Sequence, residues 1–258
     1  MTEVLHARAF EDNYIWIVRG AAPDRAVVVD PGDADPVFAA LDAAGLRLAA
    51  ILCTHHHGDH VGGVAALTAR FPVPVFGPAR ERIAAVTVPL ADGDRAALDD
   101  LGLNFRVLDV PGHTAGHIAY VGHGLLFCGD TLFSAGCGRL FEGTAAQLHA
   151  SLTRLAALPP ETQVYCGHEY TRANLGFARR VEPDNPDIAA HLKTVEALRA
   201  ADRPSLPSTI GLERRINPFL RSGEPAVRAA AEREAGTTLA DPAAVFAALR
   251  RWKDHYRG

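Results

Sequence analysis

The sequence has no long apolar run and no leader-like start. No stretch approaches the roughly 18 consecutive apolar residues that suggest a membrane-spanning helix. The opening residues, Met1 to His6, contain no basic segment followed by an apolar one, so we expect no secretory signal. These two absences predict a cytoplasmic protein that does not bind membranes.

Cysteines are few and widely spaced. They are Cys53, Cys128, Cys137 and Cys166, and no pair has the CxxC spacing. In a chain of 258 residues this usage predicts free thiols in a reducing compartment. We interpret all four as packing residues. Apolar residues make up 48% of the chain, which is enough for a substantial core without disulfides.

Charge of neither sign dominates. The chain has 26 Lys and Arg residues against 30 Asp and Glu residues, and its formal net charge is −4. This balance gives no general field that would attract nucleic acid, so we expect no nucleic-acid partner. An anionic substrate would have to be met by a local basic patch.

Short apolar runs alternate with turns and helical stretches over the first two-thirds of the chain. We predict strands at residues 14–18, 26–29, 49–53, 73–76, 105–110, 118–121, 125–128 and 164–166, and helices at 36–44, 64–70 and 144–158. After about residue 170 the strand signals fade, and helices are predicted at 188–201, 226–234 and 243–252. We therefore predict an α/β catalytic domain at residues 1–170 and a smaller α-helical domain at 171–258.

The segment Thr54-His55-His56-His57-Gly58-Asp59-His60 carries four metal-ligand side chains at a strand-to-helix junction. Residues two apart in extended backbone point the same way, so His55 and His57 can bind one ion. Asp59 and His60 lie where the chain turns into a helix, which suits a second ion. His56 falls between the ligands and receives no metal role. Imidazole and carboxylate are ligand types for zinc, iron and manganese.

Three further segments place ligand-type residues just after predicted strands, where a sheet can direct several side chains to one point. They contain His113, Asp130 and His168. Each of these residues alone would more often have a structural role. The HxHxDH spacing is rare by chance, however, and three further ligand-type residues at separate strand ends later in the chain favour a metal site. We interpret Asp30 and His117 as residues that orient the ligands.

The motifs THHHGDH, GHTAGH, GDTLF and GHEYT resemble those of the metallo-β-lactamase superfamily. The resemblance implies an α/β fold, an αββα sandwich, with two metal ions at one edge. By position in the motifs, it assigns one ion to His55, His57 and His113, the other to Asp59, His60 and His168, and a bridging role to Asp130.

Three features narrow the resemblance to one family. The β-lactamases of the superfamily have cysteine at the bridging position, where this chain has Asp130. The segment 137–144 is similar to the substrate loop of the hydroxyacylglutathione hydrolases (glyoxalase II), and segments 209–213, 217–221 and 250–254 are similar to that family's C-terminal region. The residues that the family would use to bind glutathione are Arg139, Phe141, Tyr170, Arg250 and Lys253. The family often has tyrosine at the position of Phe141.

This family resemblance implies hydrolysis of S-(2-hydroxyacyl)glutathione, with S-D-lactoylglutathione as the natural substrate, to glutathione and D-lactate in methylglyoxal detoxification. The attacking group would be a hydroxide that bridges two divalent ions, most simply zinc, with iron or manganese as alternatives. Asp59 and Asp130 would orient it, and the sequence does not choose which holds its proton. We expect a monomer that binds a small glutathione thioester.

Three other interpretations of the same fold remain. A glutathione persulfide dioxygenase would bind a single iron and would lack this helical tail. A phosphodiester nuclease would need an extended basic surface, which the sequence does not show. A binding module without activity would be expected to lack ligands, whereas all seven are present.

Overall fold

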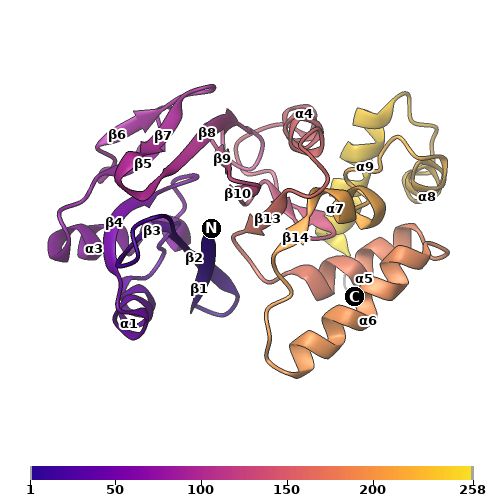
Figure 1. Cartoon of the computed structure of the whole chain (residues 1–258). Helices are drawn as coiled ribbons and strands as arrows, with labels where there is room; N and C mark the ends of the chain where they lie inside the picture. The colour runs from indigo at the N-terminus through magenta and orange to yellow at the C-terminus, as the bar shows by residue number, and fades with distance from the viewer. Residues whose placement is uncertain (1, 257–258) are drawn as a thin grey trace. The chain divides into compact units, whose positions relative to one another are not determined.

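The computed structural model describes residues 2–256, which divide into two compact units (Figure 1). Unit 1 consists of residues 1–109 and 115–129, and unit 2 of residues 110–114 and 130–258. Both units are therefore built from segments that are discontinuous in the sequence. These units are defined by packing, and the predicted division at residue 170 stays a prediction.

The first sheet of unit 1 has six strands in the order β1–β2–β3–β4–β5–β6. The strands are β1 (Glu3–Ala9), β2 (Asn13–Arg19), β3 (Arg25–Val29), β4 (Arg47–Leu52), β5 (Val75–Pro78) and β6 (Val88–Leu90). The first three pair antiparallel and the rest parallel. The central strands β3 and β4 are apolar and almost wholly buried, as expected for parallel strands covered on both faces.

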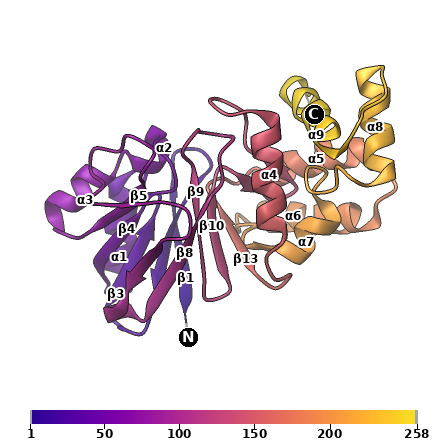
Figure 2. The same cartoon turned by 90° about the horizontal axis from the view of Figure 1, so that it is seen from above.

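Three helices connect the parallel strands: α1 (Ala34–Ala44), α2 (Gly58–Val61) and α3 (Val64–Arg70). Helix α1 begins at Asp33, whose side chain accepts from the backbone N–H of Asp35, and ends at Gly45 in the left-handed conformation. Val37 and Leu41 of α1 and Leu67 of α3 pack against the first sheet, on the face turned away from the second sheet (Figure 2).

The second sheet of unit 1 contains β7 (Arg95–Leu98), β8 (Leu103–Asp109), β9 (Ile118–Gly122) and β10 (Leu125–Gly129), with the 3-10 turn η1 (Asp99–Leu101) between β7 and β8. Neighbouring strands pair antiparallel. Tyr120 donates its hydroxyl hydrogen to the carbonyl of Cys53 at 2.9 Å, and the N–H of Ile118 donates to the carbonyl of Thr54 at 3.0 Å. These bonds attach the second sheet to the end of β4, where the first metal motif begins.

Unit 2 is mainly helical. It contains the short hairpin β11 (Leu132–Phe133) and β12 (Gly136–Cys137), the pair β13 (Gln163–Cys166) and β14 (Ser208–Thr209), and helices α4 (Ala145–Ala156), α5 (Thr171–Val181), α6 (Pro186–Ala200), α7 (Ile210–Ile216), α8 (Pro225–Ala235) and α9 (Pro242–His255). Helix α5 packs on α6 and α8, while α9 packs on α4 and α8. The helical tail predicted after residue 170 is therefore confirmed.

Several helices of unit 2 begin at side chains that accept hydrogen bonds from their first backbone N–H groups. Thr144 and Gln147 form a reciprocal capping box at α4, and Asn185 and Asp241 cap α6 and α9. Among residues 2–256, none of the helices has the length and apolarity that crossing a bilayer requires.

Candidate metal centre

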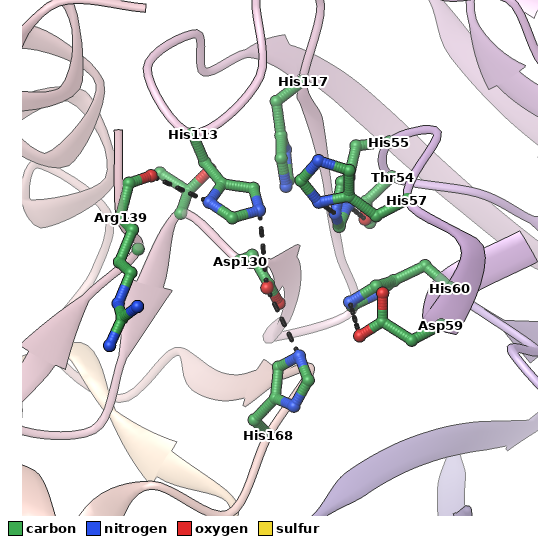
Figure 3. Close-up of polar contacts among 12 residues, drawn as sticks. Thr54, His55, His57, Asp59, His60, His113, His117, Asp130, Arg139 and His168 are labelled. Atoms are coloured by element: carbon green, nitrogen blue, oxygen red, sulfur yellow. Dashed lines mark hydrogen bonds and ion pairs between the residues drawn. The ribbon is translucent and has the colours of Figure 1, made fainter. Parts of the chain in front are cut away.

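The motif between β4 and α3 brings ligand atoms together within unit 1. Nε2 of His55 lies 3.1 Å from Nδ1 of His57. Nε2 of His60 lies 3.5 Å from Oδ2 of Asp59 (Figure 3). The rings of His55 and His60 are 4.2 Å apart between centroids. The four predicted ligands of this motif therefore form one cluster.

Polar side chains hold the opposite edges of these imidazoles. Asp30, directly after β3, accepts from the hydroxyl and the N–H of Thr54, both at 2.7 Å, and its Oδ2 lies 3.1 Å from Nδ1 of His60. The Thr54 hydroxyl lies 3.1 Å from Nδ1 of His55. Asn13 donates to Oδ2 of Asp59 at 3.0 Å. Such contacts fix ring orientation and leave Nε2 of His55 and His60 for a metal.

The two remaining histidines of unit 1 near the motif have other contacts. Nδ1 of His56 lies 2.8 Å from the buried carboxylate of Glu81, which also accepts from the N–H of Gly116 at 3.2 Å. His117 stacks on the ring of His55 with centroids 4.5 Å apart. These contacts agree with the interpretation of His56 as no ligand and of His117 as a support for His55.

In unit 2, one carboxylate lies between two imidazoles. Oδ2 of Asp130, after β10, is 3.5 Å from Nε2 of His113 and 3.3 Å from Nε2 of His168 (Figure 3). All three side chains are buried. The main-chain carbonyl of Arg139 lies 2.9 Å from Nδ1 of His113, so this nitrogen carries the proton and Nε2 keeps its lone pair for a metal. The ring of Tyr170 stacks parallel on His168 at 4.7 Å.

These donor sets fit a divalent metal. Tetrahedral bonds of about 2.0–2.1 Å separate neighbouring ligand atoms by about 3.3 Å, and the four pairs of ligand-type atoms described above lie 3.1–3.5 Å apart. Imidazole and carboxylate are also the donors that zinc, iron and manganese take. Buried, closely spaced acceptors of this kind would repel one another unless cations or protons lay between them.

All five residues predicted to bind glutathione belong to unit 2. Arg139 and Phe141 follow the hairpin and are exposed, with 64% of Phe141 accessible, and Tyr170 is 36% accessible. Lys253 on α9 is half-buried. Burial, together with the positive charges of Arg250 and Arg139, lowers the pKa of its ammonium to about 8.

Arg250 is placed differently from Lys253, although both lie on α9. Only 4% of Arg250 is accessible. Its Nη1 donates to the carbonyl of Cys137 at 2.9 Å and to that of Gly138 at 3.4 Å, and its Nη2 donates to Asp254 at 3.0 Å. The guanidinium also lies over the ring of Phe219 at 5.2 Å. Its hydrogen bonds are therefore to Cys137 and Gly138 of the predicted substrate loop and to a neighbour on α9.

The structure also gives a role to two polar residues of segments 209–213 and 217–221, for which the sequence predicted no function of their own. Glu213 of α7 is fully buried and accepts from the Ser134 hydroxyl and the Ala135 N–H, both at 2.8 Å, while burial raises the pKa of its carboxyl. Asn217 donates to the carbonyls of Phe133 and Gly136 at 3.1 and 2.9 Å. Together they hold the hairpin β11–β12. Their only sequence signal is polarity beside apolar helix positions.

Two protein-family models match the chain. The metallo-β-lactamase superfamily matches residues 9–168, and the family described as hydroxyacylglutathione hydrolase C-terminus matches residues 169–256. The fold class predicted from the motifs is thereby confirmed.

Related proteins match over nearly their whole length. A hydroxyacylglutathione hydrolase from Alkalilimnicola ehrlichii is 60% identical over 98% of this chain and 99% of its own, and one from Nitrosomonas eutropha is 52% identical over the whole of both. Among solved structures, ETHE1 from Myxococcus xanthus has a TM-score of 0.66 at 28% identity, with 98% of both chains covered. A protein solved in a di-iron-bound form has a TM-score of 0.59 at 31% identity, with 83% of this chain and 98% of that one covered.

Proposed function

The chain belongs to the hydroxyacylglutathione hydrolase family of the metallo-β-lactamase superfamily, and we propose that it hydrolyses S-(2-hydroxyacyl)glutathione thioesters. The substrate we favour is S-D-lactoylglutathione, with glutathione and D-lactate as products. In the cell this reaction would complete the detoxification of methylglyoxal. The observation that carries the proposal is in unit 2, where one backbone carbonyl, that of Arg139, joins the predicted substrate loop to the ligand-type His113.

The proposed cofactor is a pair of divalent ions, and zinc is our first choice. The residues that would hold them are His55, His57, Asp59, His60, His113, Asp130 and His168. When bound, such ions lower the pKa of water and polarise the carbonyl under attack. The di-iron form of one solved relative keeps iron as an alternative, and manganese takes the same donors.

The chain's own residues then supply orientation and proton handling. Asp30 fixes His60, and the carbonyl of Arg139 fixes His113, so both imidazoles present Nε2. Asp59 and Asp130 are the carboxylates proposed to orient the attacking water and to hold its proton. The water oxygen bonds to the acyl carbon, the carbon–sulfur bond breaks, and glutathione leaves as a thiolate. A thiolate is a good leaving group, so no separate general acid is needed.

Recognition of glutathione is assigned to the cations and rings of unit 2. Glutathione has two carboxylates, and in a chain of net charge −4 they must meet a local basic cluster. Arg139 and Lys253 are our proposed partners for these carboxylates. The Tyr170 hydroxyl would bind the peptide portion, and the exposed Phe141 ring would pack on it without a hydroxyl contact. Arg250 belongs to the same cluster.

We extend the proposal to organisation and location. Residues 1–170 would form the catalytic domain, which also supplies Arg139, Phe141 and Tyr170 to the substrate, and residues 171–258 would form the helical glutathione-binding domain, although positions 1, 257 and 258 lie outside the described residues. We propose a cytoplasmic monomer without nucleic-acid or membrane partners. Gel filtration with light scattering tests the monomer, and a dimer mass would contradict it.

The first experiment is an assay of the purified protein with S-D-lactoylglutathione before and after chelation, with metals counted on the same sample. We expect hydrolysis that is lost on chelation and about two ions per chain. Two bound ions without turnover of any 2-hydroxyacylglutathione would contradict the substrate. One iron with oxygen uptake would contradict the reaction.

A further inference from the structure

We propose that Arg250 is a positioning residue for the metal ligand His113, acting through the backbone of residues 137–139. The metal-binding role of His113 rests on the proposed function, but the contacts that connect the two residues do not. In this arrangement, α9 would set the geometry of the metal centre as well as contribute to glutathione binding.

The first step is the attachment of Arg250 to the loop. Its side chain is almost entirely buried, and Nη1 donates to the carbonyls of Cys137 and Gly138. The ion pair with Asp254 at 3.0 Å and the ring of Phe219 hold the guanidinium from the other sides. A buried guanidinium with this many contacts is fixed in position, and it restrains the carbonyls to which it donates.

The second step leads from the loop to His113. The next residue, Arg139, offers its carbonyl to Nδ1 of His113 at 2.9 Å, and the N–H of Phe141 donates to the His113 carbonyl at 3.2 Å. Gly138 lies between Cys137, which accepts from Arg250, and Arg139, which accepts from His113. A side chain at Gly138 would collide with the carbonyl of Asp130 and lie 3.1 Å from Nδ1 of His113. The loop is therefore packed tightly against both ligand-type residues, and a shift at residues 137–138 would move them.

Lys253 provides the contrast on the same helix. Its ammonium lies over the rings of Phe177 and Tyr256, 5.4 Å from each centroid. The structure describes no hydrogen bond from Lys253 to residues 137–139. Loss of Lys253 should therefore change the affinity for glutathione thioesters alone, whereas loss of Arg250 should also change the affinity for metal.

The test measures zinc affinity by competition with a chelating dye in wild type, R250A, R250K and K253A, all checked for folding by circular dichroism. Loss of a residue that orients a metal ligand lowers metal affinity by about 10–100-fold. We expect at least a tenfold loss and a lower kcat in R250A, a smaller loss in R250K, which keeps one donor, and wild-type zinc affinity with a raised KM in K253A.

Wild-type zinc affinity in R250A, with only KM raised, would overturn the proposal, because Arg250 would then act on the glutathione thioester alone. If R250A does not fold, R250K decides, and wild-type zinc affinity in that variant overturns it. Because the zinc measurement needs no substrate, an inactive wild-type protein would contradict the proposed function without affecting this test.

Discussion

A single carboxylate oxygen, Oδ2 of Asp130, lies within 3.5 Å of two buried imidazoles. We predict that D130A lowers the metal content below two ions per chain and removes most of kcat, because it deletes the proposed bridge. Elemental analysis and steady-state kinetics on one sample measure both. The isosteric D130N controls for shape and should retain the fold with weakened metal binding. Two ions and near wild-type kcat in D130A would contradict the bridging role.

If Lys253 binds a glutathione carboxylate as proposed, the binding of glutathione thioesters should depend on pH near neutrality. Its pKa of about 8 reflects burial first and then Arg250 and Arg139, with Asp254 acting in the opposite direction. The ammonium is charged below this pKa and neutral above it, so its attraction for a glutathione carboxylate is present below pH 8 and is lost above it. We predict that KM rises as the pH increases from 7 to 9.

The matched control for that prediction is K253M, which has no titrating group. Its KM should be higher than that of wild type at pH 7 and should not show the rise around pH 8. The measurement is kcat and KM for one thioester across the pH series, corrected for spontaneous hydrolysis. The same rise in K253M as in wild type would assign the titration to another group.

The hairpin β11–β12 shows how one element depends on another far along the chain. Its turn residue Ala135 has φ 54°, a strained conformation for a residue with a Cβ. Glu213 accepts from the N–H of Ala135 and from Ser134, Ser208 and Asn217. Tertiary hydrogen bonds from α7, rather than local turn preference, therefore fix the conformation of this hairpin.

We predict that E213A lowers the free energy of unfolding by about 3 kcal/mol, because it leaves several buried donors without an acceptor. E213Q should cost about 1 kcal/mol or less, because its oxygen can accept from Ala135 and Asn217 while its amide donates to the two serine hydroxyls. Urea unfolding of both variants makes the comparison. Equal stability of E213A and wild type would show that the buried donors find other acceptors.

The pH dependence of stability gives Glu213 a second readout. Burial raises the folded-state pKa of this carboxyl above its unfolded value. Its contribution to the free energy of unfolding is therefore most favourable below the unfolded pKa and is lost as the pH rises through the folded pKa. Relative to E213Q, the wild type should therefore become less stable as the pH rises over that window. Unfolding free energies at a series of pH values test the sign.

Elements with strong local signals were predictable, and those that depend on distant contacts were not. The helix predicted at 64–70 coincides with α3, and the one predicted at 36–44 ends at Gly45 as expected. The sequence did not predict α5, whose surface is largely polar and which contains Gly176. It did not predict β1 either, because that strand is partly exposed. It also missed β11 and β12, because two-residue strands have no periodicity of their own.

The same limit applies to the site. The motifs predicted seven metal ligands, because the spacing of imidazole and carboxylate side chains can be seen within short segments of the sequence, and this ligand set stays a prediction. The direction of Arg250 was not predictable, because basic residues in the last turns of a helix are usually solvated and sequence does not reveal burial. Only the structure shows that its donors meet the carbonyls of Cys137 and Gly138.

At the scale of the whole molecule, we predict that bound metal stabilises the fold. A ligand that binds only the folded state adds about 4 kcal/mol at 1,000 times its Kd, and the closely spaced carboxylates and imidazoles lose their counter-charge when it is removed. The metal-free protein should therefore unfold at a lower temperature, and added zinc should restore the transition. Differential scanning calorimetry measures the shift. Identical transitions with and without metal would argue against a site that binds metal in the folded protein.

Residues late in the chain hold the hairpin and the loop of unit 2, and this order has a consequence for folding during translation. When residue 200 has left the exit tunnel, all seven proposed ligands have emerged from the ribosome, but Glu213, Asn217 and Arg250 have not. Until they emerge, the hairpin and the carbonyls of Cys137 and Gly138, which directly precede the carbonyl that orients His113, lack their hydrogen-bond partners. The nascent chain should therefore hold metal poorly, and tight loading should wait for α9, the last helix to be translated.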